Sequence, residues 1–252
     1  ISPCTYELLL VICAAYIPIS TIHVISLFFN PCIFHREGVS MKSLILFLIL
    51  YCLTLFSASA QKETNNWYFG DHSDISFQTS PPAPRGDGQI NTREGCASIS
   101  DKTTGALLFY TDGVTVWNSN HQIMTNGTGL KGGTSSSQSA LIVPNPANSL
   151  QYYIFTAPDL TGNGITSTAL YYTLVSLETP SGEVLSKNVF LIDSVAEKLT
   201  GTKDCSGTGF WVVTHHKNNN TFYSFHITNT GINLTPVVSS YNEGIRKHRL
   251  GC

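Results

Sequence analysis

Residues 97–118 read ASISDKTTGALLFYTDGVTVWN, which is three short β-rich runs separated by two turn signals. The first signal is Lys102–Gly105 and the second is the pair Asp112-Gly113. An Asp-Gly pair between apolar runs is a strong hairpin signal, because both residues tolerate a positive φ. This stretch therefore predicts antiparallel strands joined by tight turns.

The same pattern occurs twice more downstream, so the chain is expected to contain three copies of one unit. Thr111, Thr156 and Thr214 end the middle strand of each copy, at intervals of roughly 45 and 58 residues, which is the spacing of propeller blades. The longer interval accommodates an additional hairpin. The strands predicted for the three copies are 97–100, 107–111 and 114–117; 139–143, 152–156 and 168–175; and 197–201, 210–214 and 221–227.

A single unit of this kind has an apolar face that it cannot bury alone, and radial stacking of units would bury it. We therefore predict an all-β fold, a partial β-propeller-like array of antiparallel blades. A β-sandwich is the alternative, since it also has short strands and frequent turns. The best helical candidate, Asp193–Thr200, is too weak to predict a helix.

The composition excludes some functional classes. Only 12% of the 252 residues are charged and the net charge is −2, so we expect no nucleic-acid partner. The cysteines that follow residue 60 are Cys96, Cys205 and Cys252, which form neither a disulfide framework nor a zinc pattern. A Cys96–Cys205 bridge is an open alternative that the spacing does not support. No cofactor is predicted.

The N-terminal region predicts export. Met41-Lys42 begins a signal peptide at residues 41–60, with an apolar Leu44–Phe56 and a small-x-small pattern that predicts cleavage between Ala60 and Gln61. Residues 1–40 are interpreted as an upstream, non-native extension. The alternative is a transmembrane helix at about 8–29. We expect residues 61–252 to be secreted or to lie on the outer cell surface, without spanning the membrane.

The mature chain is expected to open with a strand at Asn66–Gly70, which Asp74–Phe77 continues. Two polar segments, Pro81–Gly88 and Gly127–Ser137, are predicted to be loops because they are rich in Pro, Gly and Ser. The first of these loops contains the tripeptide Arg85-Gly86-Asp87, which is interpreted as a solvated loop.

Several of these segments resemble a known family. The segments NNWYFG (65–70), NTREGCASISD (91–101), LLFYTDGVTVWN (107–118) and FWVVTH (210–215) are similar to the N-terminal propeller-like region of large secreted proteins of Bacteroidota. Those proteins end in a gliding-motility-associated, type IX secretion sorting domain. The resemblance implies export machinery as a partner, and it carries no enzymatic chemistry. The basic tail at 244–252 departs from the family, so we expect a fragment that precedes the C-terminal domain.

We therefore expect a non-enzymatic binding or adhesion module for an extracellular glycan or protein ligand. The candidate ligand contacts are Trp117, Trp211 and His215, because aromatic rings on strands offer a large contact area at low entropic cost. One alternative is a secreted propeller-type enzyme that acts on glycans, which would need convergent acids. The candidate acids for that alternative are Asp112, Asp159 and Asp204. The other alternative is a structural spacer.

Overall fold

The computed structural model describes residues 62–161 and 167–241, and within these ranges the chain is all-β. The predicted extension or transmembrane helix within residues 1–40, the predicted signal peptide with its cleavage position Ala60–Gln61, and the tail at 244–252 all lie outside the described residues. The described strands, in chain order, are β1 (Asn66–Phe69), β2 (Ser73–Ser76), β3 (Ala97–Ser100), β4 (Leu107–Thr111), β5 (Thr115–Asn118), β6 (Ile123–Thr128), β7 (Ala140–Pro144), β8 (Gln151–Thr156), β9 (Leu170–Ser176), β10 (Glu183–Ile192), β11 (Val195–Lys203), β12 (Phe210–His216), β13 (Thr221–Thr228), β14 (Gly231–Ile232) and β15 (Val237–Ser240).

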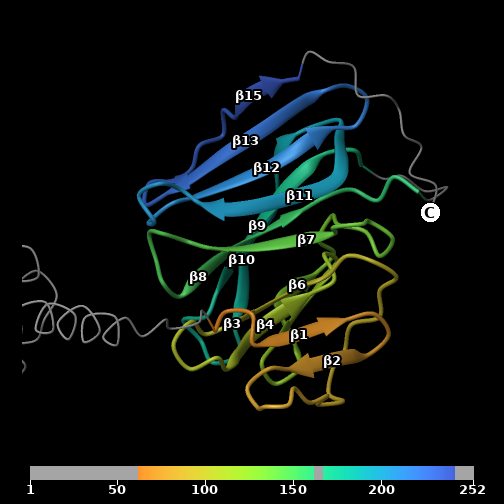
Figure 1. Ribbon diagram of the computed structural model, residues 1–252, viewed down its shortest axis with the longest axis vertical. Coiled ribbons are helices and arrows are strands. Elements are labelled where there is room, and N and C mark those ends of the chain that lie inside the picture. The colour runs from red at the N-terminus through yellow and green to blue at the C-terminus, as the bar shows by residue number, and fades with distance from the viewer. Residues whose placement is uncertain (1–61, 162–166, 242–252) are drawn as a thin grey trace, which may run out of the picture. The chain divides into compact units, whose positions relative to one another are not determined.

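The strands form one hairpin and three antiparallel meanders (Figure 1). The hairpin is β1–β2, the first meander is β3–β6 and the second meander is β7–β10. The third meander is β11–β13, and both β14 and β15 pair with β13. Each meander therefore pairs its strands mostly with their neighbours in sequence.

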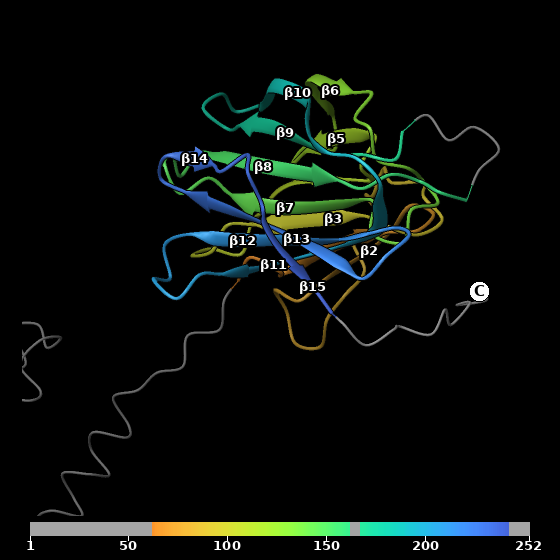
Figure 2. The ribbon, with the colours of Figure 1, turned by 90° about the horizontal axis from the view of Figure 1, so that it is seen from above.

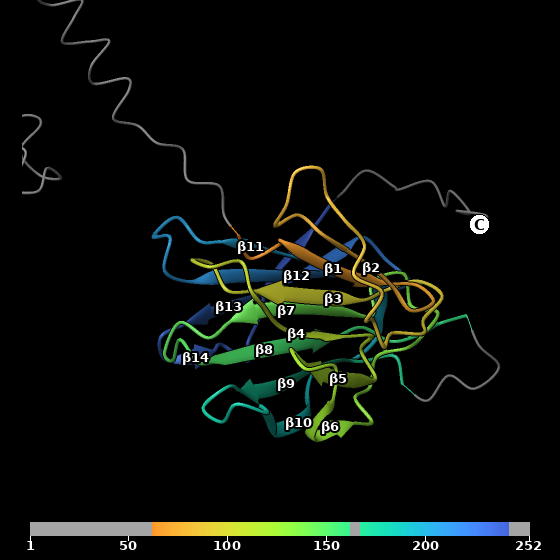
Figure 3. The ribbon, with the colours of Figure 1, turned by 90° about the horizontal axis from the view of Figure 1, so that it is seen from below.

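The first two meanders join into one eight-stranded sheet. Their last strands, β6 and β10, pair in parallel through Thr125 and Glu183, and they lie side by side in Figures 2 and 3. Their first strands, β3 and β7, stand at the two ends of the strand order and are also in contact. The sheet is consequently barrel-like and nearly closed.

Apolar side chains fill the spaces between successive layers. The core between the first and second meanders contains Phe109, Ile154 and Val175, and all three are fully buried. A second core joins the second meander to the third, and a third core packs the hairpin against the first meander. The core between the second and third meanders includes Phe155, Val212 and Phe225. The core between the hairpin and the first meander includes Tyr68, Tyr110 and Trp117. Each meander therefore buries an apolar face against its neighbour, which a single unit could not do.

The turn between the first two strands is built in the same way in all three meanders. The N–H of its first residue donates to a carbonyl five or six residues later, in the pairs Asp101–Ala106 (2.8 Å), Asn145–Gln151 (2.9 Å) and Asp204–Gly209 (2.9 Å). The side-chain oxygen of that first residue also accepts the N–H two residues later, at 3.0 Å in every case. Asp and Asn favour this Asx turn, so the repeat extends to the turns.

The predicted strands of the three copies are confirmed with small boundary shifts, and two predictions need correction. Asp74–Phe77 does not continue the first strand: the chain reverses at Gly70 and His72, where φ is 61° and 52°, and forms β2. The weak helical candidate lies mostly in strand β11, and the predicted loop at 127–137 begins inside β6. Cys96 and Cys205 are both free. Strands β6 and β10 were not predicted.

Candidate functional site

A pocket of about 290 Å³ lies where the segment after β2 meets the first meander. Polar side chains from the β2–β3 segment and from the β5–β6 turn form its walls, and two apolar residues lie beside them, one just before β4 and one at its first position. We call it the Arg85 pocket, and its lining residues are Gln78, Arg85, Ala106, Leu107, Ser119 and His121.

The loop that carries Arg85 is shaped around the buried carboxylate of Asp74 on β2. This carboxylate accepts the backbone N–H groups of four consecutive residues, Arg85 (2.6 Å), Gly86 (3.0 Å), Asp87 (3.0 Å) and Gly88 (3.1 Å). Burial raises the pKa of Asp74, but the four N–H donors outweigh burial, so the pKa lies below its usual value. The Arg85-Gly86-Asp87 tripeptide is therefore wrapped around an ionised side chain of its own protein.

Arg85 is held in place by a buried amide. Its Nη1 donates to Oδ1 of Asn66 at 3.1 Å. The amide of Asn66 is oriented in turn by its Nδ2, which donates to Ser100 Oγ at 3.0 Å and to Gly105 O at 2.9 Å. Asn66 has no exposed surface, whereas the Arg85 side chain is 40% exposed. The guanidinium is thus fixed at one edge and open to solvent at another.

His121 enters the pocket from the tight β5–β6 turn, where its φ is 61°. Its Nε2 lies 3.3 Å from Asp87 Oδ2 and its Nδ1 lies 3.2 Å from the hydroxyl of Tyr110. When the ring proton is on Nε2, the nitrogen that faces the Asp87 carboxylate, Nδ1 can accept a hydrogen bond from the Tyr110 hydroxyl. Tyr68 donates to the other oxygen of Asp87 at 2.9 Å. Both ring nitrogens of His121 therefore have partners.

A stack of aromatic rings carries the tyrosine hydroxyls that contact Asp87 and His121. The rings of Tyr68 and Tyr110 lie 4.3 Å apart at 10°, and those of Tyr110 and Trp117 lie 5.5 Å apart at 13°. Burial raises the pKa of Tyr110 to about 12, and burial together with Asp87 raises that of Tyr68. Both phenols therefore remain neutral hydrogen-bond donors at physiological pH. Trp117, a candidate ligand contact, is 9% exposed and belongs to this stack.

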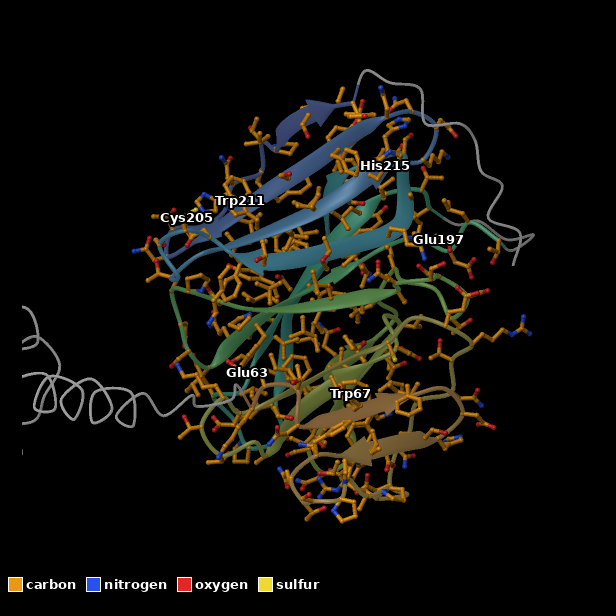
Figure 4. All side chains as sticks on the ribbon, in the orientation of Figure 1. Glu63, Trp67, Glu197, Cys205, Trp211 and His215 are labelled. Atoms are coloured by element: carbon orange, nitrogen blue, oxygen red, sulfur yellow. The ribbon has the colours of Figure 1, made fainter. Side chains whose placement is uncertain are left out.

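The other two candidate contacts, Trp211 and His215, lie on β12 of the third meander (Figure 4). Trp211 stacks on His226 with ring centres 4.2 Å apart, and His226 Nε2 is 3.1 Å from Asp204 Oδ2. His215 meets the ring of Phe222 edge-on at 4.7 Å. Burial, with a smaller contribution from the neighbouring His216, lowers the pKa of His215. These side chains belong to a different sheet from the Arg85 pocket.

The three candidate catalytic acids are each engaged in a local turn. Asp112 Oδ1 accepts the N–H groups of Val114 and Thr115, at 2.8 and 2.7 Å. Asp159 accepts both the N–H and the hydroxyl of Thr161, and Asp204 accepts donors from its own Asx turn and from His226. In the described part of the chain, no three or more His, Cys, Asp or Glu residues could together hold a metal ion.

The Arg-Gly-Asp tripeptide, which its composition predicts to be a solvated loop, is a sequence feature that falls in this site. Asn66, Tyr110 and His121 come from three other places in the chain, and no spacing rule connects them. Comparison with protein-family models, with curated proteins and with solved structures returns no significant match. In the residues described by the structure, no helix has the length and apolar character needed to cross a membrane.

Proposed function

We propose that this chain is a non-enzymatic binding module, exported as part of a larger bacterial surface or secreted protein, and that it contacts its ligand through the Arg85 pocket. The observation that carries the proposal is the anchoring of Arg85. The Asp74 carboxylate fixes its backbone and the Asn66 amide fixes one edge of its guanidinium, while 40% of the side chain stays exposed. Since little side-chain entropy is left to lose, binding to this group costs less.

The pocket also has the mixed character of a binding site. Arg85 and Ser119 supply polar groups that can fix the orientation of a ligand, and Ala106 and Leu107 supply apolar surface beside them. The pocket volume of about 290 Å³ is near the lower limit for small-ligand sites, so it suits a small group on a larger extracellular molecule.

We propose a propeller-like arrangement for the whole unit. The three antiparallel meanders support this arrangement, because each contains the same type of Asx turn and successive meanders pack through apolar cores. Propeller blades are likewise small antiparallel sheets packed side by side. The resemblance of the sequence to the N-terminal region of exported Bacteroidota proteins supports the proposed surface location.

The glycan-active enzyme is less well supported than the binding module. Glycoside hydrolysis requires two carboxylates that flank one bond at a defined separation. Asp112, Asp159 and Asp204 are each engaged in a separate turn, and Asp74 has four N–H donors around it. A structural spacer is the other alternative, and it predicts no specific ligand.

Arrays of extracellular glycans and of peptides, probed with the full chain, test the proposal. We expect selective binding that Arg85→Ala reduces at least tenfold. Arg93→Ala is the matched control, because Arg93 is exposed and its side chain makes no hydrogen bond or ion pair within the described residues. A wild-type protein that binds nothing on either array, or an Arg85→Ala variant that binds equally well, would contradict the proposal.

A further inference from the structure

We infer that the group recognised by the Arg85 pocket is a carboxylate. This inference rests on the proposed binding function and specifies its ligand chemistry. It follows from three observations. Arg85 and Ser119 have donors without a partner, the acids near Arg85 bind other donors more closely, and apolar surface lies beside the donors.

The donors without a partner belong to Arg85 and Ser119. Nη1 of Arg85 bonds to Asn66 and its Nε faces Asp87, but no acceptor among residues 62–161 and 167–241 bonds to Nη2. Within the same ranges, the hydroxyl of Ser119 has no partner either. A carboxylate has two acceptor oxygens and no donor, and guanidinium N–H groups are well suited to it.

The carboxylates of Asp74 and Asp87 make their shortest contacts with groups other than the Arg85 guanidinium. The negative charge of Asp74 is stabilised by four backbone N–H groups. Asp87 accepts from Tyr68 at 2.9 Å and faces His121 at 3.3 Å, whereas its distance to Arg85 Nε is 3.6 Å. Arg85 is thus the most distant of the three partners of Asp87, and its outer edge can take a second anion.

The size of the pocket and its neighbouring charge favour a single negative charge. Asp87 would repel a doubly charged phosphate more than a carboxylate, and no lysine or second arginine lines the pocket to offset this repulsion. Ala106 and Leu107 give the carbon skeleton next to the carboxylate an apolar surface. A sugar acid or an acidic amino-acid residue presents this combination.

Titration calorimetry of the full chain with four small probes tests the inference. It also distinguishes a sugar acid from an acidic amino-acid residue as the source of the carboxylate. D-glucuronate and its neutral counterpart D-glucose represent the sugar, and N-acetyl-glutamate amide and N-acetyl-glutamine amide represent the peptide. We expect one acid to bind at least tenfold more tightly than its neutral counterpart. The affinity should fall as salt is added, because the ion pair is partly exposed to solvent.

Variants assign this preference to the pocket. Arg85→Gln should abolish it, Arg85→Lys should retain part of it, and Ser119→Ala should weaken it about threefold, while Arg93→Gln should leave it unchanged. Circular dichroism of each variant checks that it folds. Equal binding of acid and neutral probes, lost in Arg85→Gln, would overturn the carboxylate inference and leave the binding function intact. A chain that binds neither these probes nor any array ligand would overturn both.

Discussion

The hairpin end of the molecule and the outer face of the third meander differ in the side chains that they expose to solvent. At the hairpin, a long segment folds back over β1 and β2, and a buried carboxylate, a buried amide and the phenol of Tyr68 hold it in place. At the third meander, apolar side chains stand in solvent, with Val237 at 57% and Phe222 at 36% exposed. A strand face alone gives surface area, whereas a folded-back loop also gives fixed donors, so the hairpin end is the better binding site.

The two regions also use aspartate differently. Asp74 binds N–H groups that lie 11 to 14 residues away in sequence, so it fixes a long segment. The backbone N–H groups that Asp204 binds are only two and five residues away, so its backbone contacts shape a single short turn. This difference predicts the order of the mutational effects that follow.

The largest effect is expected for Asp74→Ala. Four N–H donors would lose their acceptor, and we expect the free energy of unfolding to fall by about 3 kcal/mol in chemical denaturation at pH 7. Asp71→Ala is the control, because the side chain of Asp71 is 82% exposed, and it should change the free energy by less than about 0.5 kcal/mol. Similar losses in the two variants would mean that Asp74 does not organise the loop.

The contribution of Asp74 should depend on pH in a defined direction. Its pKa in the folded protein is lowered, so the stabilisation is fully present above the pKa of the unfolded chain, about 4, and is lost as pH falls below that value. The difference in unfolding free energy between wild type and Asp74→Asn should therefore shrink as the pH falls below about 4. A difference that stays constant across this range would be inconsistent with an ionised Asp74.

A smaller effect is expected for Tyr68→Phe. This change removes the hydroxyl that donates to Asp87 and leaves the stack with Tyr110 in place. The unfolding free energy should fall by about 1 kcal/mol, since Asp87 keeps its other contacts and is partly exposed to water. Ligand affinity should fall as well, because Asp87 is then free to approach Arg85. An unchanged affinity would separate the tyrosine network from the binding site.

Asp204→Ala should have a smaller effect on stability than Asp74→Ala, because the turn that it shapes is short and exposed. Its local effect should be clear, since His226 loses the carboxylate partner that holds its ring against Trp211. We expect a red shift of tryptophan emission in Asp204→Ala that Asp71→Ala does not show. A thermal midpoint lowered as far as in Asp74→Ala would remove the proposed distinction between the two regions.

The smallest effect on stability is expected for Val237→Thr on the edge strand β15. The side chain is 57% exposed, so its replacement should change the unfolding free energy by less than about 0.5 kcal/mol. Exposed apolar surface on an edge strand promotes association, so binding of a hydrophobic dye and light scattering at high concentration should both decrease. A large loss of stability would show that this face is more closely packed than the structure indicates.

Sequence patterns predicted the repeated strands but not the faces that they present. A bulge explains part of this difference: Ile99 pairs with Phe109 and Ser100 pairs with Leu107, which leaves Leu108 as an extra residue. Beyond the bulge, Phe109 faces the second meander and Tyr110 faces the hairpin. The pairs next to the aligned threonines are regular in all three copies, yet Phe109 faces the following meander whereas Ile154, at the aligned position, faces the preceding one. An alignment on Thr111 is therefore out of phase with the packing.

The Arg85 pocket could not be predicted from the sequence, because its residues are far apart along the chain. Its residues come from the β2–β3 segment, from the start of β4 and from the β5–β6 turn, and long-range contacts bring them together. The decisive contact is Asp74 with the loop, which has the composition of a solvated segment. Composition predicts a loop there, but it does not show that one carboxylate collects four backbone donors.

Local strand pairing has a consequence for how the chain folds. Nearly all strand pairs join sequence neighbours, so each meander can form by closing short loops at a small entropic cost. The parallel pairing of Thr125 with Glu183 joins the first two meanders and closes a much longer loop. Nascent chains would therefore assemble hairpin by hairpin, and amide hydrogens within the meanders should gain protection from exchange before those at the junction of β6 and β10.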